Sequence, residues 1–236
     1  MANLVNNASG SMFIDYLTKA YYKLDNTTDS GPSGLTLTNS GTTTFIAGKF
    51  GNCAHFVRTS SQFLYVSNSG GIDGGEITIS LWFKATNNPA NGTYYCLACQ
   101  SNNSTKVGYF IYYYTTGTTQ YLWFVRNKLG VLSQGPTATY TLTAGSWFNV
   151  VLVYESGNVR GYVNGKLIAG PTAASGNGSG TFSTNMVIGC QDNVGSAHYA
   201  NGDIDEVIYQ ARGWGNPEIY NYYTQYKGAL GSASNY

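Results

Sequence analysis

The chain has 236 residues, of which only 10% are charged, and its 12 Lys and Arg against 11 Asp and Glu leave a net charge of +1. No basic field is present to attract a polyanion, so the composition argues against nucleic-acid binding and gives no reason to expect a membrane surface as partner. No stretch approaches the roughly 20 apolar residues of a membrane span, and the first residues carry no secretory signal, so no membrane insertion is expected.

The predicted elements begin after an N-terminal arm, residues 1–19, which shows no clear period. Residues 20–24 predict the first strand and residues 25–45 a polar loop region. Strand candidates bounded by Gly, Asn, Ser or Thr then recur at short intervals, and no amphipathic helix separates them. They are AHFVR, QFLYVS, ITISLWFKA, TYYCLACQ, VGYFIYYY, QYLWFVR, ATYTLT, WFNVVLVYE, VRGYVNG, KLIA, MVIGC and IDEVIYQA. This rhythm predicts an all-β sandwich and argues against an α/β fold.

The segment 146–170, SWFNVVLVYESGNVRGYVNGKLIAG, predicts the centre of the sandwich. Both faces of its first strand are largely apolar, which is typical of a strand buried on two sides. Asn164-Gly165 is a strong signal for a type I′ hairpin turn. Near the C-terminus, GNPEIYNYYTQYKG predicts one short helix, with Asn216 as its cap, Pro217 in its first turn and Gly228 at its end. Residues 229–236 are expected to form a tail.

The four cysteines are expected to be buried free thiols. Cys96 and Cys99 have the spacing of a zinc or redox pair, but they lie in a predicted strand, where residues three apart point to opposite faces. Free thiols suit assembly in a reducing compartment. A disulfide between Cys53 and Cys190 stays open at this point.

Five segments, in order, resemble the concanavalin A-like lectin/glucanase superfamily and in particular its laminin-G-like jelly-roll branch. They are AYYKLDNTTDSG, GKFGNCAHFVRTSSQFLYVS, EITISLWFKA, WFNVVLVYESGNVRGYVNGKLIA and NGDIDEVIYQARGWGNPEIYNYY. The resemblance covers residues 20–228, although 93–142 match only in their strand rhythm. It implies a two-sheet antiparallel jelly-roll sandwich with one short C-terminal helix, a scaffold that serves binding, catalysis and structure alike.

No catalytic residue is predicted. Catalytic members of this superfamily carry two or three carboxylates on one strand face, and GDIDEV is the one segment here that approaches this pattern. Asp203 and Asp205 share a strand face, but Val207 holds the next position and no second Glu follows. The histidines, His55 and His198, are far apart in sequence and belong to no evident Ser/His/Asp set. The protein is therefore expected to be no enzyme.

A structural Ca²⁺ is the one cofactor that the sequence suggests, because members of this superfamily often bind calcium. Asp29 lies in a loop rich in oxygen ligands, and Asp205 would join it across the fold, with Asp192 and Asp203 as reserves. The alternative, which is slightly favoured, is that Asp29 makes an Asx turn and Asp205 pairs with backbone amides.

The tyrosine clusters suggest contacts with sugars, because an aromatic face packs on ring C–H groups while the hydroxyl forms hydrogen bonds. Most of these residues, such as Tyr109, Tyr113 and Tyr121, are expected to form cross-strand pairs that cover a sheet face. Tyr94 and Tyr199, at loop ends, are the predicted ligand-binding residues.

The first hypothesis is therefore a non-catalytic, lectin-like module on a virion surface. It would be a bacteriophage decoration or fibre-type protein that binds cell-surface glycans or contacts other virion proteins to stabilise the particle, with the arm as its attachment segment. The second is a secreted, extracellular carbohydrate-binding module or adhesin, and the third a glycoside hydrolase. The sequence leaves a homo-oligomer open.

Overall fold

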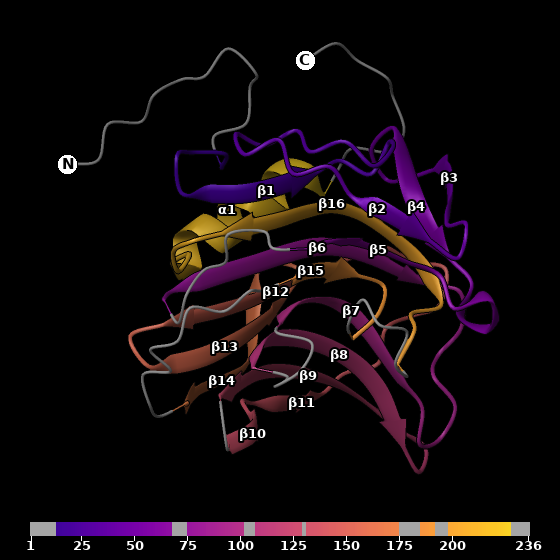
Figure 1. Ribbon diagram of the computed structural model, residues 1–236. Coiled ribbons are helices and arrows are strands. Elements are labelled where there is room, and N and C mark those ends of the chain that lie inside the picture. Colours follow the sequence, from indigo (N-terminus) through magenta and orange to yellow (C-terminus); the bar gives the residue numbers. More distant parts are fainter. Residues whose placement is uncertain are drawn as a thin grey trace.

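The structure is a computed structural model that describes residues 13–67, 75–101, 107–128, 131–174, 185–191 and 198–227, without the side chains of 128 and 131–134. Figure 1 shows two antiparallel sheets stacked on each other, with one α-helix against the outside of one sheet. The predicted all-β jelly-roll sandwich with a single C-terminal helix is thus confirmed.

The first sheet, called sheet A, has eight strands in the described part of the chain. Seven form a continuous path, and the eighth pairs with the fifth strand of that path. In spatial order they are β14 (Lys166–Ala173), β13 (Asn158–Val163), β12 (Phe148–Glu155), β6 (Ile77–Ala85), β16 (Gly202–Gln210), β4 (Asn52–Phe56) and β3 (Thr44–Ala47), with β1 (Thr18–Tyr22) paired to β16.

The second sheet, sheet B, also has eight strands among the described residues. Its order is β10 (Val131–Gln134), β9 (Thr119–Lys128), β8 (Gly108–Thr116), β7 (Tyr94–Ser101), β15 (Asn185–Ile188), β5 (Phe63–Val66) and β2 (Thr38–Ser40), with β11 (Thr137–Thr139) paired to β9. The 3₁₀ turn η1 (Arg58–Ser60) connects β4 to β5, so the chain crosses between the sheets there.

The predicted central hairpin is confirmed. Asn164 and Gly165 have φ values of 50° and 77°, the left-handed pair that a type I′ turn needs, and they join β13 to β14. Strand β12 lies between β6 and β13. One of its faces, with Leu152, lies in the core between the sheets, and the other, with Val151 and Val153, packs under α1, which explains why both faces are apolar.

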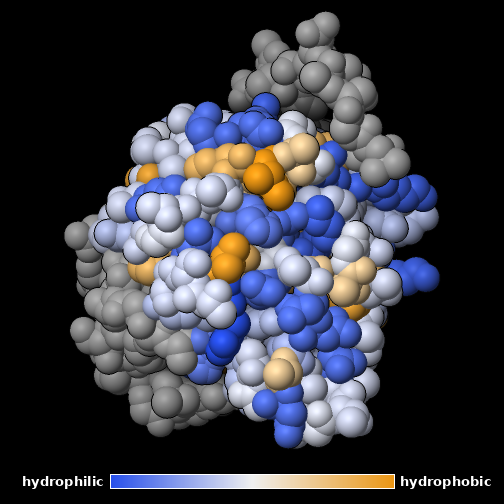
Figure 2. Space-filling view, turned by 90° about the vertical axis from the view of Figure 1, so that its right-hand side faces the viewer, coloured by the Kyte–Doolittle hydropathy of each residue, from blue (hydrophilic) through white to orange (hydrophobic). Residues whose placement is uncertain are grey.

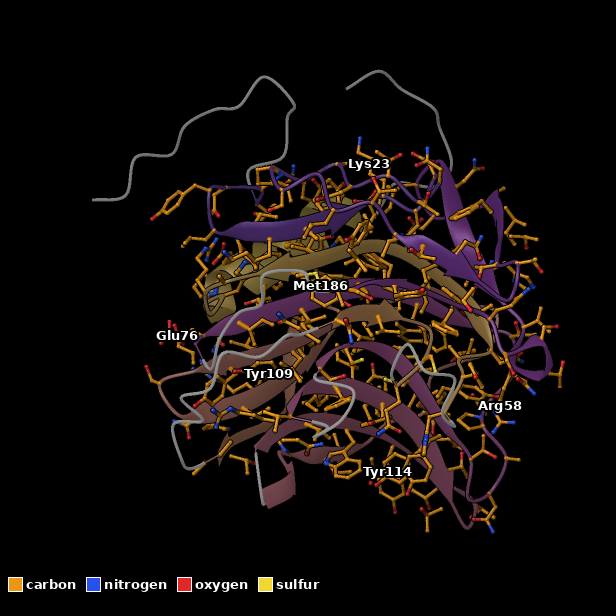
Figure 3. All side chains as sticks on the ribbon, in the orientation of Figure 1. Lys23, Arg58, Glu76, Tyr109, Tyr114 and Met186 are labelled. Atoms are coloured by element: carbon orange, nitrogen blue, oxygen red, sulfur yellow. The ribbon has the colours of Figure 1, made fainter. Side chains whose placement is uncertain are left out.

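The core fills the space between the two sheets and is built from alternate residues of their strands. Tyr109 and Met186 point into this space, whereas Tyr114 lies toward the outside of the molecule (Figure 3). The sheets approach most closely where the Phe124 ring of β9 packs on Gly161 of β13, since a Cβ at position 161 would lie 2.1 Å from that ring. Only glycine leaves room for this contact.

Helix α1 (Asn216–Tyr226) covers the outer face of sheet A. Pro217 lies in its first turn as predicted, but Gly215 is the N-cap, while the Asn216 side chain accepts a hydrogen bond from the Tyr162 hydroxyl at 2.6 Å. Trp214 and Phe13 are buried beside the helix, with ring centroids 5.7 Å apart. The packed fold therefore includes residues from 13 on, which the sequence had placed in the arm.

Two β-bulges change which side chains share a face. In β7 the register with β8 shifts between Cys96 and Ala98, so Cys96 and Cys99 both lie on the outer face of sheet B. The prediction that they point to opposite faces was wrong, because period-2 alternation fails across a bulge. All four cysteines are free and buried, and Cys53 and Cys190 belong to different sheets, so they form no disulfide.

The second bulge lies in β16, where the register with β6 shifts between Asp205 and Ile208. Glu206 takes a φ of 52° there, and Val207 turns into the core between the sheets. The prediction that Val207 follows Asp203 and Asp205 on one face was therefore wrong, for the same physical reason as in β7.

The only α-helix of the described residues is α1, and it is neither long nor apolar enough to cross a membrane.

Candidate functional site

A row of tyrosine rings crosses three strands on the outer face of sheet B. Tyr94 of β7 lies opposite Tyr114 of β8, which lies opposite Tyr121 of β9. The Tyr94 and Tyr114 rings are stacked, with centroids 4.6 Å apart and planes 10° apart, and Tyr114 and Tyr121 follow at 5.2 Å and 20°. All three are half-buried. We call these three residues the tyrosine row.

Two further rings adjoin the row at an angle. Trp123, two residues after Tyr121 on β9, is half-buried and stands at 60° to Tyr114, with centroids 6.2 Å apart. His198 meets Tyr94 edge to face at 5.1 Å. The three rings of the row are each partly exposed, and Trp123 adds a larger ring that stands across the row.

Both predicted ligand-binding residues lie on this outer face of sheet B. Tyr94 is the first ring of the row, and Tyr199 packs beside Phe63 of β5, with ring centroids 6.2 Å apart. Beneath these rings lies an apolar layer that includes Cys96, Cys99 and Cys190. The thiols thus support the aromatic face from below and act as small apolar side chains.

The tyrosines proposed as cross-strand pairs do not all share one face. Tyr109 and Tyr113 point into the core, where burial raises the pKa of each to about 12. Tyr121 lies on the opposite face, because the β8–β9 hairpin pairs it with Tyr114 and not with Tyr113. Sequence reasoning missed Tyr114 and Trp123 as members of the site, although the register that follows from the turn at Gly117 would have aligned Tyr114 with Tyr121.

The outer face of sheet A carries the acidic residues of GDIDEV. Asp203 is buried, and each of its carboxylate oxygens has a side-chain partner: His55 Nδ1 at 2.5 Å and the Lys84 ammonium at 2.7 Å. These three residues lie opposite one another on β4, β16 and β6. Lys84 also lies over the Trp147 ring, 5.0 Å from its centroid. The arrangement is a closed ion-pair network on the sheet surface.

Asp205 lies on the same face but deeper. Its Oδ2 accepts hydrogen bonds from the backbone N–H groups of Lys49 and Phe50, each at 2.9 Å. Burial raises the pKa of Asp205 to about 8 and that of the neighbouring Glu206 to about 7. Glu206 accepts a hydrogen bond from the Tyr21 hydroxyl. Both carboxyl groups are enclosed, so they do not form the exposed acid pair that glycoside hydrolysis needs.

The Asp29 carboxylate fixes the conformation of its loop through hydrogen bonds to backbone N–H groups. Its Oδ1 accepts hydrogen bonds from the backbone N–H groups of Tyr21 at 2.9 Å and Gly31 at 2.7 Å, and its Oδ2 from that of Leu35 at 2.9 Å. This is the Asx-turn arrangement that was the alternative to a metal site. Asp29 and Asp205 accept their hydrogen bonds from different backbone segments.

No group of three His, Cys, Asp or Glu side chains suited to a metal ion occurs among the described residues, and the reserve ligand Asp192 lies outside them. Calcium at Asp29 and Asp205 stays a prediction.

Large exposed apolar side chains are scattered in the described part of the chain: Tyr16, Ile46, Leu167 and Tyr220. The side of the molecule seen in Figure 2 is mostly hydrophilic, with small, separate hydrophobic spots. A polar ligand suits this surface better than a broad apolar partner.

Two antiparallel sheets in a jelly roll, with an aromatic outer face, define a lectin-like β-sandwich. The family model of the concanavalin A-like lectin/glucanases superfamily matches residues 58–212, more than half of the chain. The protein therefore belongs to this superfamily, which confirms the resemblance seen in the sequence. A search of curated proteins found no match.

Several solved structures share the fold. Domain 4 of AbnA, a GH43 extracellular arabinanase from Geobacillus stearothermophilus solved with arabinotriose, aligns with a TM-score of 0.62 at 15% identity, over 86% of this chain and 97% of that domain. The binding domain of botulinum neurotoxin DC, solved in complex with SialylT, aligns with a TM-score of 0.68 at 14% identity, over 89% of this chain and 52% of that one.

The binding domain of Paraclostridial Mosquitocidal Protein 1 gives a TM-score of 0.67 at 13% identity, over 89% of this chain and 52% of that one. The protein thus spans about half the length of the two toxin binding domains and nearly all of the arabinanase domain. At these identities the likeness establishes a common fold.

Proposed function

We propose that the protein is a non-catalytic glycan-binding module that uses the outer face of sheet B. The observation that carries this proposal is the tyrosine row with Trp123 beside it, a set of half-buried aromatic rings and hydroxyls gathered on one face. Such side chains supply both the apolar contact and the hydrogen bonds that sugars need. The arabinotriose and SialylT complexes of the structural neighbours support a glycan as the ligand class.

The absence of catalysis is part of the proposal. It is supported by Asp203, whose two oxygens are held by His55 and Lys84, and by Asp205 and Glu206, which are enclosed under the helix. A hydrolysis assay on neutral polysaccharides, with Asp205→Asn as the comparison variant, tests it. We expect no turnover. Turnover that is abolished in a folded Asp205→Asn variant would contradict it.

The biological setting that we propose is a virion surface, with the module as a phage decoration or fibre-type protein. The four buried free thiols support assembly in a reducing compartment. The described chain ends, Phe13 and Lys227, lie beside α1 on sheet A, on the opposite side of the sandwich from the tyrosine row. A mass-spectrometric inventory of purified particles is expected to contain the chain, and its absence would remove this setting.

A secreted carbohydrate-binding module is the second candidate, and one observation favours it. The arabinanase domain, which belongs to an extracellular enzyme, is matched over 97% of its length. A signal segment encoded upstream of this chain, together with its recovery from culture medium, would decide for secretion.

A calcium ion at Asp29 and Asp205 remains a separate proposal, which a thermal unfolding scan in Ca²⁺ and in chelator tests. A bound ion would raise the melting temperature in Ca²⁺, because a ligand of the folded state stabilises it. Carboxylates that serve only the backbone amides of their loops would give the same melting temperature in both solutions.

A further inference from the structure

The charge distribution on sheet B points to the kind of glycan that it binds. In the eight strands of this sheet the only charged residues are Arg126 and Lys128, both on β9. Arg126 points into the core, where its guanidinium lies 4.2 Å from the centroid of the Tyr154 ring and Nη1 donates to the Ala174 carbonyl at 3.0 Å. Among the described side chains, the outer face of sheet B therefore carries no charged strand residue.

Two described segments beside the tyrosine row are uncharged as well. Residues 86–93 and 135–147, which adjoin the ends of β7, β8, β9 and β11, contain only neutral side chains. His198 also adjoins the row, where it meets Tyr94 edge to face. A carboxylate or sulfate that left water to bind here would lose its hydration without gaining a Lys or Arg partner among the described strand side chains of this face, which costs affinity.

The stacking within the row fixes how a ligand meets it. The ring faces of Tyr94, Tyr114 and Tyr121 are pressed against one another, so the middle ring offers its edge and hydroxyl to a ligand. Because the row crosses three strands that are about 4.8 Å apart, a ligand in contact with all three rings lies across the strands and is longer than one monosaccharide. Trp123 is the ring that stands at an angle to the stack and suits packing against a sugar ring.

We propose that the outer face of sheet B binds an uncharged oligosaccharide laid along the tyrosine row, with Trp123 as its stacking platform. This inference rests on the proposed glycan-binding function and adds the class of glycan. The structural neighbours do not decide it, since one was solved with arabinotriose and another with SialylT. The lack of charged strand residues among the described side chains on the outer face of sheet B favours a neutral glycan.

Isothermal titration calorimetry with arabinotriose, xylotriose and cellotriose on one side, and sialyllactose on the other, tests the inference. We expect at least one neutral trisaccharide to bind about tenfold or more tightly than sialyllactose. Its affinity should change less than about twofold between low and high salt, because no ion pair is screened. A preference for sialyllactose would overturn the inference and leave glycan binding intact, whereas binding of none of the four sugars would count against the proposed function itself.

Paired substitutions locate the site. Trp123→Ala should weaken the neutral sugar about tenfold, as loss of a central aromatic contact does. Trp147→Ala removes a half-buried Trp that precedes β12 and lies against Lys84 of sheet A, so it is the matched control and should leave binding unchanged. Tyr114→Phe keeps the stacked ring and removes only its hydroxyl, so it folds as the parent does and should lower the affinity a few-fold. Unchanged binding in both Trp123→Ala and Tyr114→Phe would place the site elsewhere.

A gain-of-charge variant tests the neutral preference directly. Thr139 of β11 is exposed and lies opposite Tyr121. Thr139→Lys should bring sialyllactose affinity up by about fivefold or more in low salt, and the gain should vanish in high salt. Thr139→Gln is the uncharged control. Equal sialyllactose affinity in both variants would show that the face does not contact the acidic group, and would argue against the proposed placement.

Discussion

The two outer faces of the sandwich are built in opposite ways. Sheet A collects the charged groups, with Asp203, Lys84 and His55 in one row and Asp205 with Glu206 deeper, and part of it is closed by α1. Sheet B has no charged side chain among the described strand residues of its outer face, and its tyrosine row is half-buried, not covered by a helix. The difference teaches that the acidic residues of sheet A are occupied in holding the fold together. The uncharged outer face of sheet B is the one that we expect to meet a ligand.

The largest expected effect concerns pH and sheet A. Because burial raises the pKa of Asp205 to about 8 and that of Glu206 to about 7, the folded protein binds more protons than the unfolded chain between about pH 4 and about pH 8. The contribution of these two carboxyl groups to stability is therefore full below about pH 4 and is lost as the pH rises through 7 and 8. The loss between about pH 5 and about pH 9 should be on the order of 5 kcal/mol.

Denaturant unfolding at several pH values measures this loss. Asp205→Asn resembles the protonated acid, so its stability should fall much less over the same pH range. If the variant and the parent lose stability equally with pH, the enclosed acid is not the source of the dependence. Glycan binding by sheet B should follow the fraction of folded protein and show no further pH dependence from Asp205.

The next largest effect compares the outer face of sheet A, which α1 covers, with the outer face of sheet B. Trp214 is fully buried between Phe13 and Tyr222, and its ring NH donates to the Gln210 side chain. Trp214→Ala should lower the free energy of unfolding by about 3–5 kcal/mol, as expected for the loss of a large core ring. Trp123→Ala, on the half-buried face of sheet B, should cost far less. Similar losses in the two variants, measured by urea unfolding, would break the comparison.

The smallest effect lies within the tyrosine row. A double-mutant cycle of Tyr94→Ala and Tyr114→Ala should give a coupling free energy of about 0.5–1.5 kcal/mol, the usual contribution of a stacked aromatic pair. Tyr94 with Tyr109, which points to the other face of the sheet, serves as the reference pair and should be close to additive. A coupling near zero for Tyr94 and Tyr114 would mean that the rings contact a ligand independently of each other.

The fold could be predicted because its signals are local. Asn164-Gly165 sets a hairpin through backbone conformation alone, and Pro217 begins a helix because its fixed φ suits the first turn. Runs of alternating residues between turn signals gave the remaining strands. None of these inferences requires knowledge of what lies across the sandwich.

The site could be predicted only in part, because it depends on register. Tyr94 and Tyr199 were predicted from their positions at loop ends, and the structure places both on the outer face of sheet B, but Tyr121 was paired with the wrong tyrosines. Cys99 and Val207 were assigned to the wrong faces because each follows a bulge. A single backbone angle, such as the φ of 52° at Glu206, changes the face of every later side chain, and no residue type in that strand signals it.

One feature of sheet A bears on how the module can be used. Phe13 lies against Tyr226 with ring centroids 6.4 Å apart, and the Lys227 carbonyl accepts a hydrogen bond from Lys49 Nζ at 3.4 Å. The two described chain ends thus leave the sandwich together, on the side away from the tyrosine row. A scaffold fused at either end, or a tandem array joined end to end, would hold many copies with their aromatic faces outward, and avidity would then multiply even a weak affinity for sugar.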